Sequence, residues 1–267
     1  MNNNITIGVL GGSGFYEFIK SPKEIEIDTP FGKPSDKILL GEYEGVKVAF
    51  LPRHARGHKL PPHAIPYRAN LWALKQLGVR YVISPAAVGS LRPEIAPGTF
   101  VICDDFLDRT KRRIDTYFDG PDVYHIPSTE AYCPALIDLA EKSLQELNIP
   151  YKKGGAVVVI EGPRFSSKTE SKYYAKMGGD IINMTQYPEV VLARELEMCY
   201  LGIGLVTDWD VGIEGDSGVE PVTAEEVVRV FQKNNEKVKS LIYHLIPRIA
   251  DRGLKCTCGE ILAQAKI

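Results

Sequence analysis

The chain has 267 residues, of which 44% are apolar and 25% charged, with a net charge of −2 and a pI near 6.2. This composition is typical of a globular protein, and the charge gives no electrostatic footprint for nucleic acid. No apolar run is long enough to span a bilayer, and the first residues lack the pattern of a signal peptide. We therefore expect a cytoplasmic protein that acts on small molecules, with neither a membrane nor nucleic acid as a partner.

Short apolar strands and one helix alternate through the first part of the chain. A helix is predicted over residues 67–77, because Leu71, Leu74 and Leu77 recur at helical spacing and Gly78 follows them. Strands are predicted over residues 5–10, 38–40, 46–51, 81–83 and 100–103, with a hairpin turn at Glu44-Gly45 and a longer turn running through Gly89.

The second part of the chain continues this alternation. Thr223 to Glu226 has a capping-box pattern that begins a long amphipathic helix, which Pro247 should end or kink. The alternation indicates an α/β fold in a single domain over residues 1–267, with a C-terminal tail over 251–267 that contains Cys256-Thr-Cys258. The other elements predicted here are helices over 134–147 and 190–199 and strands over 156–160 and 200–206.

Five polar motifs follow predicted strands, where open α/β sheets bind their ligands. Gly11-Gly12-Ser13-Gly14 could bring backbone N–H groups close to an anion, but it lacks the dinucleotide and P-loop spacings and is as readily explained as a structural turn. Two arginines and two histidines lie between Arg53 and His58, and arginine suits bidentate contact with phosphate. The other three motifs are Glu161-Gly162-Pro163-Arg164-Phe165-Ser166-Ser167, Asn183-Met184-Thr185-Gln186-Tyr187-Pro188-Glu189 and Thr207-Asp208-Trp209-Asp210.

These motifs favour an anion and an aromatic base over a metal ion as ligands. The basic loop could be a solvated surface segment, but its glycine and the prolines that follow make it rigid, which favours an anion site. No carboxylate or thiol lies near its histidines in the sequence, so no metal site is expected there. The five cysteines form no C-x-x-C framework, so a structural zinc site is not expected either.

Taken together, the motifs resemble those of the trimeric purine nucleoside phosphorylase family, in particular its archaeal and thermophilic methylthioadenosine phosphorylases. The similarity extends from Gly11 to Pro247 and is densest over residues 161–167 and 183–185. It implies one α/β domain with a central mixed sheet flanked by helices. It also implies phosphorolysis of a nucleoside, with inorganic phosphate as a co-substrate and neither a metal nor an organic cofactor.

The resemblance assigns roles to individual residues. It implies phosphate binding by Ser13, Arg53, His54, Ala87 and Thr185. It implies substrate binding by Phe165 and Ser166 at the purine, Met184 at the ribose, Asp208 and Asp210 at the purine edge, and Ala224, Val227 and Val228 at the 5′ substituent.

The resemblance also assigns roles to two histidines. His125 matches a residue that relatives lend to the site of a neighbouring subunit, and His58 is a weaker candidate for that pocket. We therefore expect a homo-oligomer, either a trimer or a hexamer. One position departs from the family pattern, since Ala86 stands where many relatives have threonine or another hydroxyl-bearing residue. One side-chain hydrogen bond to phosphate or sugar is then missing.

The expected chemistry needs a proton donor for the leaving purine. Asp208 and Asp210 are the predicted catalytic residues, and Asp208 is the predicted general acid, with its pKa raised by a closed apolar pocket. Asp208 and Asp210 can accept from a 6-amino group, and the small apolar 5′ pocket suits a methylthio group. We expect a pentosyltransferase that converts 5′-methylthioadenosine and phosphate to adenine and 5-methylthioribose 1-phosphate. The alternative is a broad purine nucleoside phosphorylase acting on adenosine, inosine or guanosine.

The cysteines are the last feature that the resemblance interprets. Thermophilic relatives pair the positions of Cys133 and Cys199, and several carry a tail like Cys256-Thr-Cys258. The resemblance therefore implies Cys133–Cys199 and Cys256–Cys258 disulfide bonds, with Cys103 as a free buried thiol. Five reduced cysteines, as in an ordinary cytosol, are the alternative.

Overall fold

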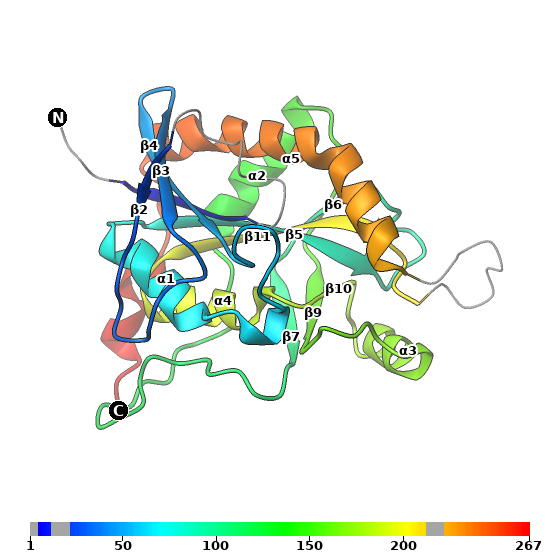
Figure 1. Ribbon diagram of the computed structural model, residues 1–267, viewed down its shortest axis with the longest axis horizontal. Helices are drawn as coiled ribbons and strands as arrows, with labels where there is room; N and C mark the ends of the chain where they lie inside the picture. Colours follow the sequence, from blue (N-terminus) through cyan, green and yellow to red (C-terminus); the bar gives the residue numbers. More distant parts are fainter. Residues whose placement is uncertain (1–4, 12–21, 212–221) are drawn as a thin grey trace.

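The computed structural model describes residues 5–11, 22–211 and 222–267, and Figure 1 shows their arrangement. The described strands form one 11-stranded sheet. The strands are β1 (Ile7–Gly11), β2 (Lys23–Ile25), β3 (Ile38–Tyr43), β4 (Val46–Pro52), β5 (Tyr81–Ser90), β6 (Phe100–Ile102), β7 (Asp105–Arg109), β8 (Tyr151–Lys153), β9 (Ala156–Ile160), β10 (Ile181–Asn183) and β11 (Cys199–Asp208). The helices are α1 (Tyr67–Gln76), α2 (Pro134–Glu146), α3 (Lys168–Lys176), α4 (Gln186–Glu195) and α5 (Ala224–Arg252), with short 3-10 helices η1 (Pro62–Ala64) and η2 (Cys258–Gln264).

The sheet contains two groups of parallel strands that run in opposite directions. β4, β1, β5 and β11 are parallel to one another, and β10, β9 and β7 form the second parallel group. The groups meet where β10 pairs antiparallel with the end of β5, at Ile182↔Gly89 and Ile181↔Ser90. The predicted α/β fold with a central mixed sheet is confirmed.

Helices cover both faces of this sheet (Figure 1). α2 and α5 pack against each other and against β11 on one face, and α1 packs against α4 on the other. β11 is buried at all ten positions, as expected for a strand between two helical layers. In the described part of the chain, no helix combines the length and the apolar character needed to cross a membrane.

Several predicted elements occur where the sequence placed them. The apolar run Ala156–Ile160 is β9, and the helices predicted over 67–77 and 134–147 are α1 and α2. The β3–β4 hairpin turns through Glu44 and Gly45, whose φ angles are 49° and 79°. Two successive positive φ angles match the twist of the flanking strands, which is why glycine is favoured at the second position.

Two predicted strand boundaries are wrong. β5 does not turn after Ile83 but continues through Pro85 to Ser90, so Ala87 lies within a strand. Proline is tolerated there because β1 pairs only with residues 81–83 of β5, which leaves no partner for an N–H on that side. Cys199 begins β11 and does not end a helix.

The last helix continues past the proline that was expected to end or kink it. Thr223 is its N-cap and accepts a hydrogen bond from the N–H of Glu226, but Pro247 does not end the helix, which continues to Arg252. Proline removes one helical hydrogen bond. Buried side chains on both sides of it, including Ile246 and Ile249, hold the helix against the core and offset that loss.

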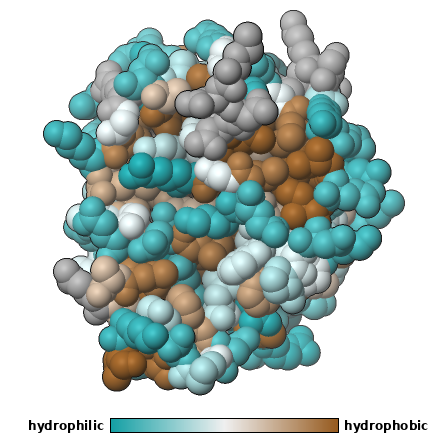
Figure 2. Space-filling view, turned by 90° about the vertical axis from the view of Figure 1, so that its left-hand side faces the viewer, coloured by the Kyte–Doolittle hydropathy of each residue, from teal (hydrophilic) through white to brown (hydrophobic). Residues whose placement is uncertain are grey.

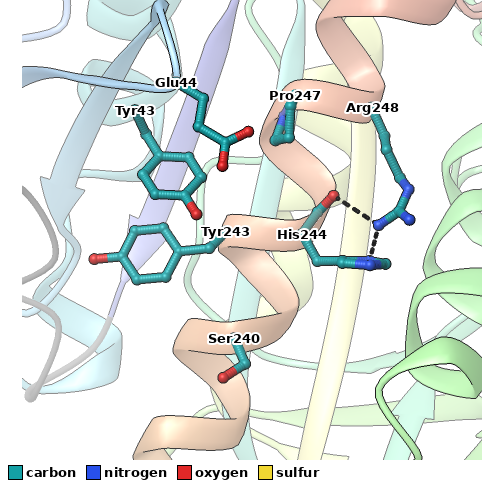
Figure 3. Close-up of a pocket in the computed structure, with 7 residues that line it drawn as sticks. All are labelled: Tyr43, Glu44, Ser240, Tyr243, His244, Pro247 and Arg248. Carbon is teal, nitrogen blue, oxygen red and sulfur yellow. Dashed lines mark hydrogen bonds between the residues drawn. The ribbon is translucent and has the colours of Figure 1, made fainter.

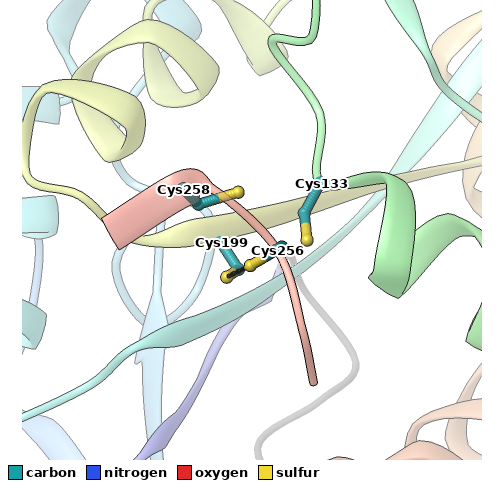
Figure 4. Close-up of side chains that lie close together, drawn as sticks. All are labelled: Cys133, Cys199, Cys256 and Cys258. Carbon is teal, nitrogen blue, oxygen red and sulfur yellow. Dashed lines mark hydrogen bonds between the residues drawn. The ribbon is translucent and has the colours of Figure 1, made fainter. Parts of the chain in front are cut away.

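The expected disulfide bonds are not supported. None of the five cysteines is bonded to another, and Cys103 is buried apart from the rest beside Gln186. Instead of two separate pairs, Cys133, Cys199, Cys256 and Cys258 form one cluster in which all four Sγ atoms lie within 4.8 Å of one another (Figure 4).

Candidate active site

The predicted site motifs converge where the two groups of parallel strands meet. β1 pairs with residues 81–83 of β5 and β10 pairs with residues 89–90, both on the side opposite β11. The intervening residues of β5 therefore face a gap between β1 and β10. The carboxyl ends of β1, β4, β10 and β11 all point towards this region of the sheet, and ligands of open α/β sheets bind at such places.

Arg53, directly after β4, fills part of this gap. Its guanidinium donates from Nη1 to the carbonyl oxygen of Pro85 (3.0 Å) and from Nη2 to that of Leu10 (3.0 Å) and to Ser84 Oγ (2.5 Å). Nε and Nη2 also donate to the two carboxylate oxygens of Glu189 in α4, at 2.6 and 3.0 Å. Arg53 is only 1% exposed, so these contacts hold β1, β4, β5 and α4 together.

These contacts change the expected role of Arg53. A guanidinium has five N–H donors, and protein acceptors already occupy all except one hydrogen on Nη1. Arg53 is therefore placed mainly to position the surrounding strands, with at most one N–H left for an anion. Its bidentate contact is with Glu189, and its predicted role as a phosphate ligand stays a prediction.

His54 follows Arg53 in the sequence and, unlike Arg53, carries no charge. Burial lowers the pKa of His54 to about 3, so its imidazole is neutral. Nδ1 lies 2.8 Å from the carbonyl oxygen of Leu60, which can only accept, so the proton is on Nδ1 and Nε2 has a lone pair. His58 stacks on this ring at 4.1 Å between centroids, and burial lowers the pKa of His58 as well. His54 can thus accept a hydrogen bond from a protonated phosphate oxygen.

The remaining phosphate candidates lie around the same gap. Thr185 is buried at the N-cap of α4, and its side chain makes no capping hydrogen bond. Ala87 lies in the part of β5 that faces the gap, paired with Leu205 of β11 on its other side. Ser13 lies outside the described residues, so its prediction stays as made.

Asp208 and Asp210 lie at the end of β11. Asp208 is 7% exposed; its Oδ2 accepts from the Thr207 hydroxyl (2.7 Å) and its Oδ1 from the N–H of Asp210 (2.8 Å). Burial raises the pKa of Asp208 to about 6, against the opposing effect of these two hydrogen bonds. A carboxyl group with this pKa can hold a proton near neutral pH and donate it.

Asp210 is less well satisfied. Burial raises the pKa of Asp210. Its Oδ2 and the Ser166 Oγ are both buried and have no hydrogen-bond partner among the described residues. Asp210 also has a positive φ of 47°. Unpaired buried polar atoms and an unusual backbone angle are features that functional sites retain.

Gly89 allows the acid pair to approach β5. A Cβ atom at this position would lie 2.9 Å from Oδ1 of Asp208 and 3.3 Å from Cβ of Asp210. Both distances are too short for a comfortable contact, so a larger residue would displace the acids. Sequence reasoning treated Gly89 as part of a turn and missed this role.

The purine and ribose candidates come from the segments that follow β9 and β10. Met184 follows β10 and packs against Gly162, where a Cβ atom added to the glycine would lie 2.6 Å from the Met184 sulfur. The carbonyl oxygen of Met184 accepts a hydrogen bond from the Tyr67 hydroxyl at 3.4 Å. Phe165 is 38% exposed at the surface beside α3. Ser167 and Glu170 form a full capping box that begins α3, a signal that sequence reasoning overlooked.

The first turn of α5 is tethered to the same site. The N–H of Val222 donates to the carbonyl oxygen of Asp210 at 2.8 Å, which brings the predicted 5′-pocket residues close to the acids. Ala224 is exposed, Val227 is partly buried and Val228 is 52% exposed. Two of the three predicted 5′-pocket side chains, Ala224 and Val228, are therefore exposed in this chain.

His125 lies in the long connection between β7 and α2. Its side chain is exposed, and its backbone N–H donates to the carbonyl oxygen of Ala265 in the C-terminal tail at 2.8 Å. The tail thus fixes the loop that carries His125. Its predicted role in a neighbouring subunit stays a prediction.

Glu189 is the most important residue that sequence reasoning left without a role. Besides Arg53, its Oε2 accepts from the hydroxyls of Ser84 and Tyr200, both at 2.8 Å. The signal was an acidic residue directly before the apolar run Val190-Val191-Leu192. A carboxylate buried with such neighbours needs a cationic partner.

A surface pocket elsewhere on the molecule contains none of the predicted site residues. It lies between the β3–β4 turn and α5, where Tyr43 stacks on Tyr243 and Arg248 donates to His244 (Figure 3). Unlike the region where β5, β10 and β11 meet, this pocket lacks a pair of buried acids. We therefore place the candidate active site at the β5–β10 junction.

Comparison with known proteins identifies the family. A model of the Phosphorylase superfamily matches residues 6–247. S-methyl-5′-thioadenosine phosphorylase of Thermofilum pendens is 49% identical, covering 98% of this chain and 99% of that protein. Purine nucleoside phosphorylase of Streptomyces coelicolor is 46% identical, covering 96% and 94% respectively. The chain belongs to the Phosphorylase superfamily.

Solved structures narrow this similarity. A methylthioadenosine phosphorylase from an antarctic soil metagenomic library has a TM-score of 0.92 at 38% identity, covering 99% of this chain and 93% of the other. Methylthioadenosine phosphorylase from Schistosoma mansoni, in complex with adenine, has a TM-score of 0.88 at 33% identity, covering 97% and 96%. Within the superfamily, the chain is thus similar to methylthioadenosine phosphorylases along nearly its whole length.

Proposed function

We propose that this protein is a pentosyltransferase that cleaves 5′-methylthioadenosine with inorganic phosphate, giving adenine and 5-methylthioribose 1-phosphate. The observation that carries the proposal is the buried Asp208–Asp210 pair. This pair lies at the end of β11, beside the junction of β5 and β10 where the anion-binding candidates also lie. The relatives named methylthioadenosine phosphorylase support the same substrate.

The reaction proceeds by displacement at C1′ of the sugar. A phosphate oxygen, held by His54, Thr185 and backbone groups of β5, forms the new bond to C1′ as the C1′–N9 bond breaks. The bonding electrons pass to the purine, and Asp208 donates its proton to N7, so adenine leaves as a neutral base. Phosphate is a co-substrate, and this scheme needs neither a metal ion nor an organic cofactor.

Recognition of adenine follows from the hydrogen bonds that the site still lacks. The 6-amino group of adenine is a donor, and the unpartnered Oδ2 of Asp210 is an acceptor. A 6-oxo purine presents an acceptor at the same place and would leave the carboxylate unpaired. A site built around one hydrogen bond rejects the mismatched analogue strongly.

The protein acts as a homo-oligomer in this proposal, as a trimer or hexamer in the cytoplasm. Phe165 and Val228 are both exposed beside the site, so a neighbouring subunit that brings His125 would close the pocket. Hydrophobic patches interrupt the hydrophilic surface on one face of the molecule (Figure 2). Such patches are common where subunits associate.

The second candidate function is a broad purine nucleoside phosphorylase, because the Streptomyces coelicolor relative has that name. A comparison of kcat/KM for methylthioadenosine, adenosine, inosine and guanosine separates the two. The proposal predicts the highest value for methylthioadenosine and the lowest values for inosine and guanosine. Equal values for methylthioadenosine and inosine would contradict it and support the broad enzyme.

A further inference from the structure

Four cysteines meet at the end of β11 opposite to the acids. Cys199 is the first residue of β11, Cys133 is the N-cap of α2, and Cys256 and Cys258 lie in the tail (Figure 4). β11 has ten residues at about 3.3 Å per residue, so its two ends are roughly 30 Å apart. The cluster is therefore outside the candidate active site.

The spacing of the four sulfurs fits a tetrahedral metal site. Zinc binds cysteine sulfur at about 2.3 Å, which places the sulfurs of a tetrahedral site about 3.8 Å apart. Here all four Sγ atoms lie within 4.8 Å of one another, and those of Cys199 and Cys256 are 3.3 Å apart. Small side-chain movements would bring them to tetrahedral spacing.

The surroundings hold the four ligands in place. Cys133 donates its N–H to the carbonyl oxygen of Tyr200, and Cys199 donates its N–H to that of Arg80. The tail is fixed by hydrogen bonds from His125 N–H to Ala265 and from Leu262 N–H to Glu197. Thiols from three separate segments are thus brought together by backbone contacts that do not depend on the sulfurs.

The local charge suits a zinc site as well. Four thiolates and one zinc ion carry a net charge of about −2, which needs compensation. Cys133 occupies the N-cap of a 13-residue helix without a side-chain capping bond, and the helix N-terminus stabilises negative charge. Arg194, which is largely buried, adds a positive charge close to Cys258.

We propose that Cys133, Cys199, Cys256 and Cys258 bind a single zinc ion that fastens the C-terminal tail to α2 and β11. All four coordination positions are filled by thiolates, so the site is structural and not catalytic. The C-x-C spacing in the tail is shorter than that of common zinc motifs, and the other two ligands are far away in the sequence. This is why sequence reasoning did not expect zinc.

The first test measures metal and thiols in the purified full-length protein. Elemental analysis should find about one zinc ion per chain, and denaturation with a chelator but no reductant should expose all five thiols. Zinc-free protein with one titratable thiol would mean two disulfides and would overturn the proposal. Zinc-free protein with five thiols that takes up no Zn²⁺ when titrated would also overturn it.

Variants identify the ligands. Cys258→Ser and Cys133→Ser should lose nearly all zinc, whereas the matched control Cys103→Ser should keep it, because Cys103 is buried outside the cluster. Retention of zinc by Cys258→Ser would contradict the assignment. If a variant does not fold, wild-type protein with Co²⁺ in place of zinc provides the readout. It should show the strong visible absorption of a tetrahedral thiolate complex, and its absence would count against the site.

Discussion

Buried carboxylates occur in two different environments around the junction of β5 and β10. Both oxygens of Glu189 accept hydrogen bonds from Arg53, and Oε2 also accepts from Ser84 and Tyr200. Asp210, by contrast, has a buried oxygen without a partner among the described residues. Asp208 accepts from one hydroxyl and one backbone N–H, and no cation of the described part of the chain contacts it.

The difference separates structural from chemical roles. A buried acid with a bidentate arginine holds neighbouring elements together. A buried acid without a cation has a raised pKa, and Asp208 and Asp210 both show this rise. Such a group can exchange a proton or a hydrogen bond with a ligand, which a fully paired carboxylate cannot do. The following variants test whether this division holds.

The largest effect is expected for Asp208→Asn. An amide cannot donate the N7 proton as an acid does, so kcat for methylthioadenosine should fall by about 10²–10⁴. KM should change little, because the side chain keeps its size. Steady-state kinetics measure both, with the exposed Asp251→Asn as the control. Near-full turnover by Asp208→Asn would show that Asp208 is not the acid.

Arg53→Ala should mainly affect stability. It removes the cationic partner of the buried Glu189 carboxylate, which costs about 3–5 kcal/mol in the free energy of unfolding. Urea denaturation measures this loss. The double variant Arg53→Met/Glu189→Leu should recover much of it, since no unpaired charge remains. An Arg53→Ala variant as stable as wild type, with only weaker phosphate binding, would make Arg53 a ligand-binding residue instead.

The pH dependence of kcat/KM in wild type and in Asp208→Asn tests the role of Asp208 separately. The pKa of Asp208 is raised from 3.8 to about 6, so its protonated form declines as the pH rises through 6. We expect kcat/KM to fall about tenfold per pH unit above that value. The Asp208→Asn variant should lack this decrease. An identical decrease in the variant would assign it to another group, such as phosphate.

The same pKa has a consequence for stability. Because the folded-state pKa is raised, the folded protein binds this proton more tightly than the unfolded chain does. The resulting stabilisation is complete below the unfolded pKa and is lost as the pH rises through about 6. At pH 8, Asp208→Asn should therefore unfold at a higher urea concentration than wild type, by an amount worth about 1–3 kcal/mol. Glu189→Gln should be less stable than wild type.

Asp210→Asn should have the smallest effect. An amide can donate to a 6-oxo group as well as accept from a 6-amino group, so discrimination between the two purines should weaken. We expect the ratio of kcat/KM for methylthioadenosine to that for inosine to fall about tenfold. An unchanged ratio would show that Asp210 does not contact the 6 position.

Much of the fold could be predicted because burial leaves a local pattern. The apolar run Ala156–Ile160 indicated β9 with its observed bounds, and the Thr223 N-cap indicated the start of α5. β5 could not be predicted in full, because Pro85 normally ends a strand and its tolerance depends on where β1 stops pairing. The continuation of α5 past Pro247 could not be predicted either, because it depends on the packing of the helix against the core.

The sequence indicated candidate site residues by their type but not the residues that they contact. The acids at 208 and 210 followed an apolar strand, and their placement agrees with that expectation. The pairing of Arg53 with Glu189 joins residues 136 positions apart, and no local pattern reports such a contact. The cysteine cluster was missed for the same reason, because its members come from three distant segments.

The central claim is that this protein breaks a nucleoside bond with phosphate. It is tested most directly by following adenine release from methylthioadenosine with and without inorganic phosphate. We predict rapid release only when phosphate is present, together with one 5-methylthioribose 1-phosphate for each adenine. Adenine release at the same rate without phosphate, with free methylthioribose as the second product, would contradict the account and identify a hydrolase.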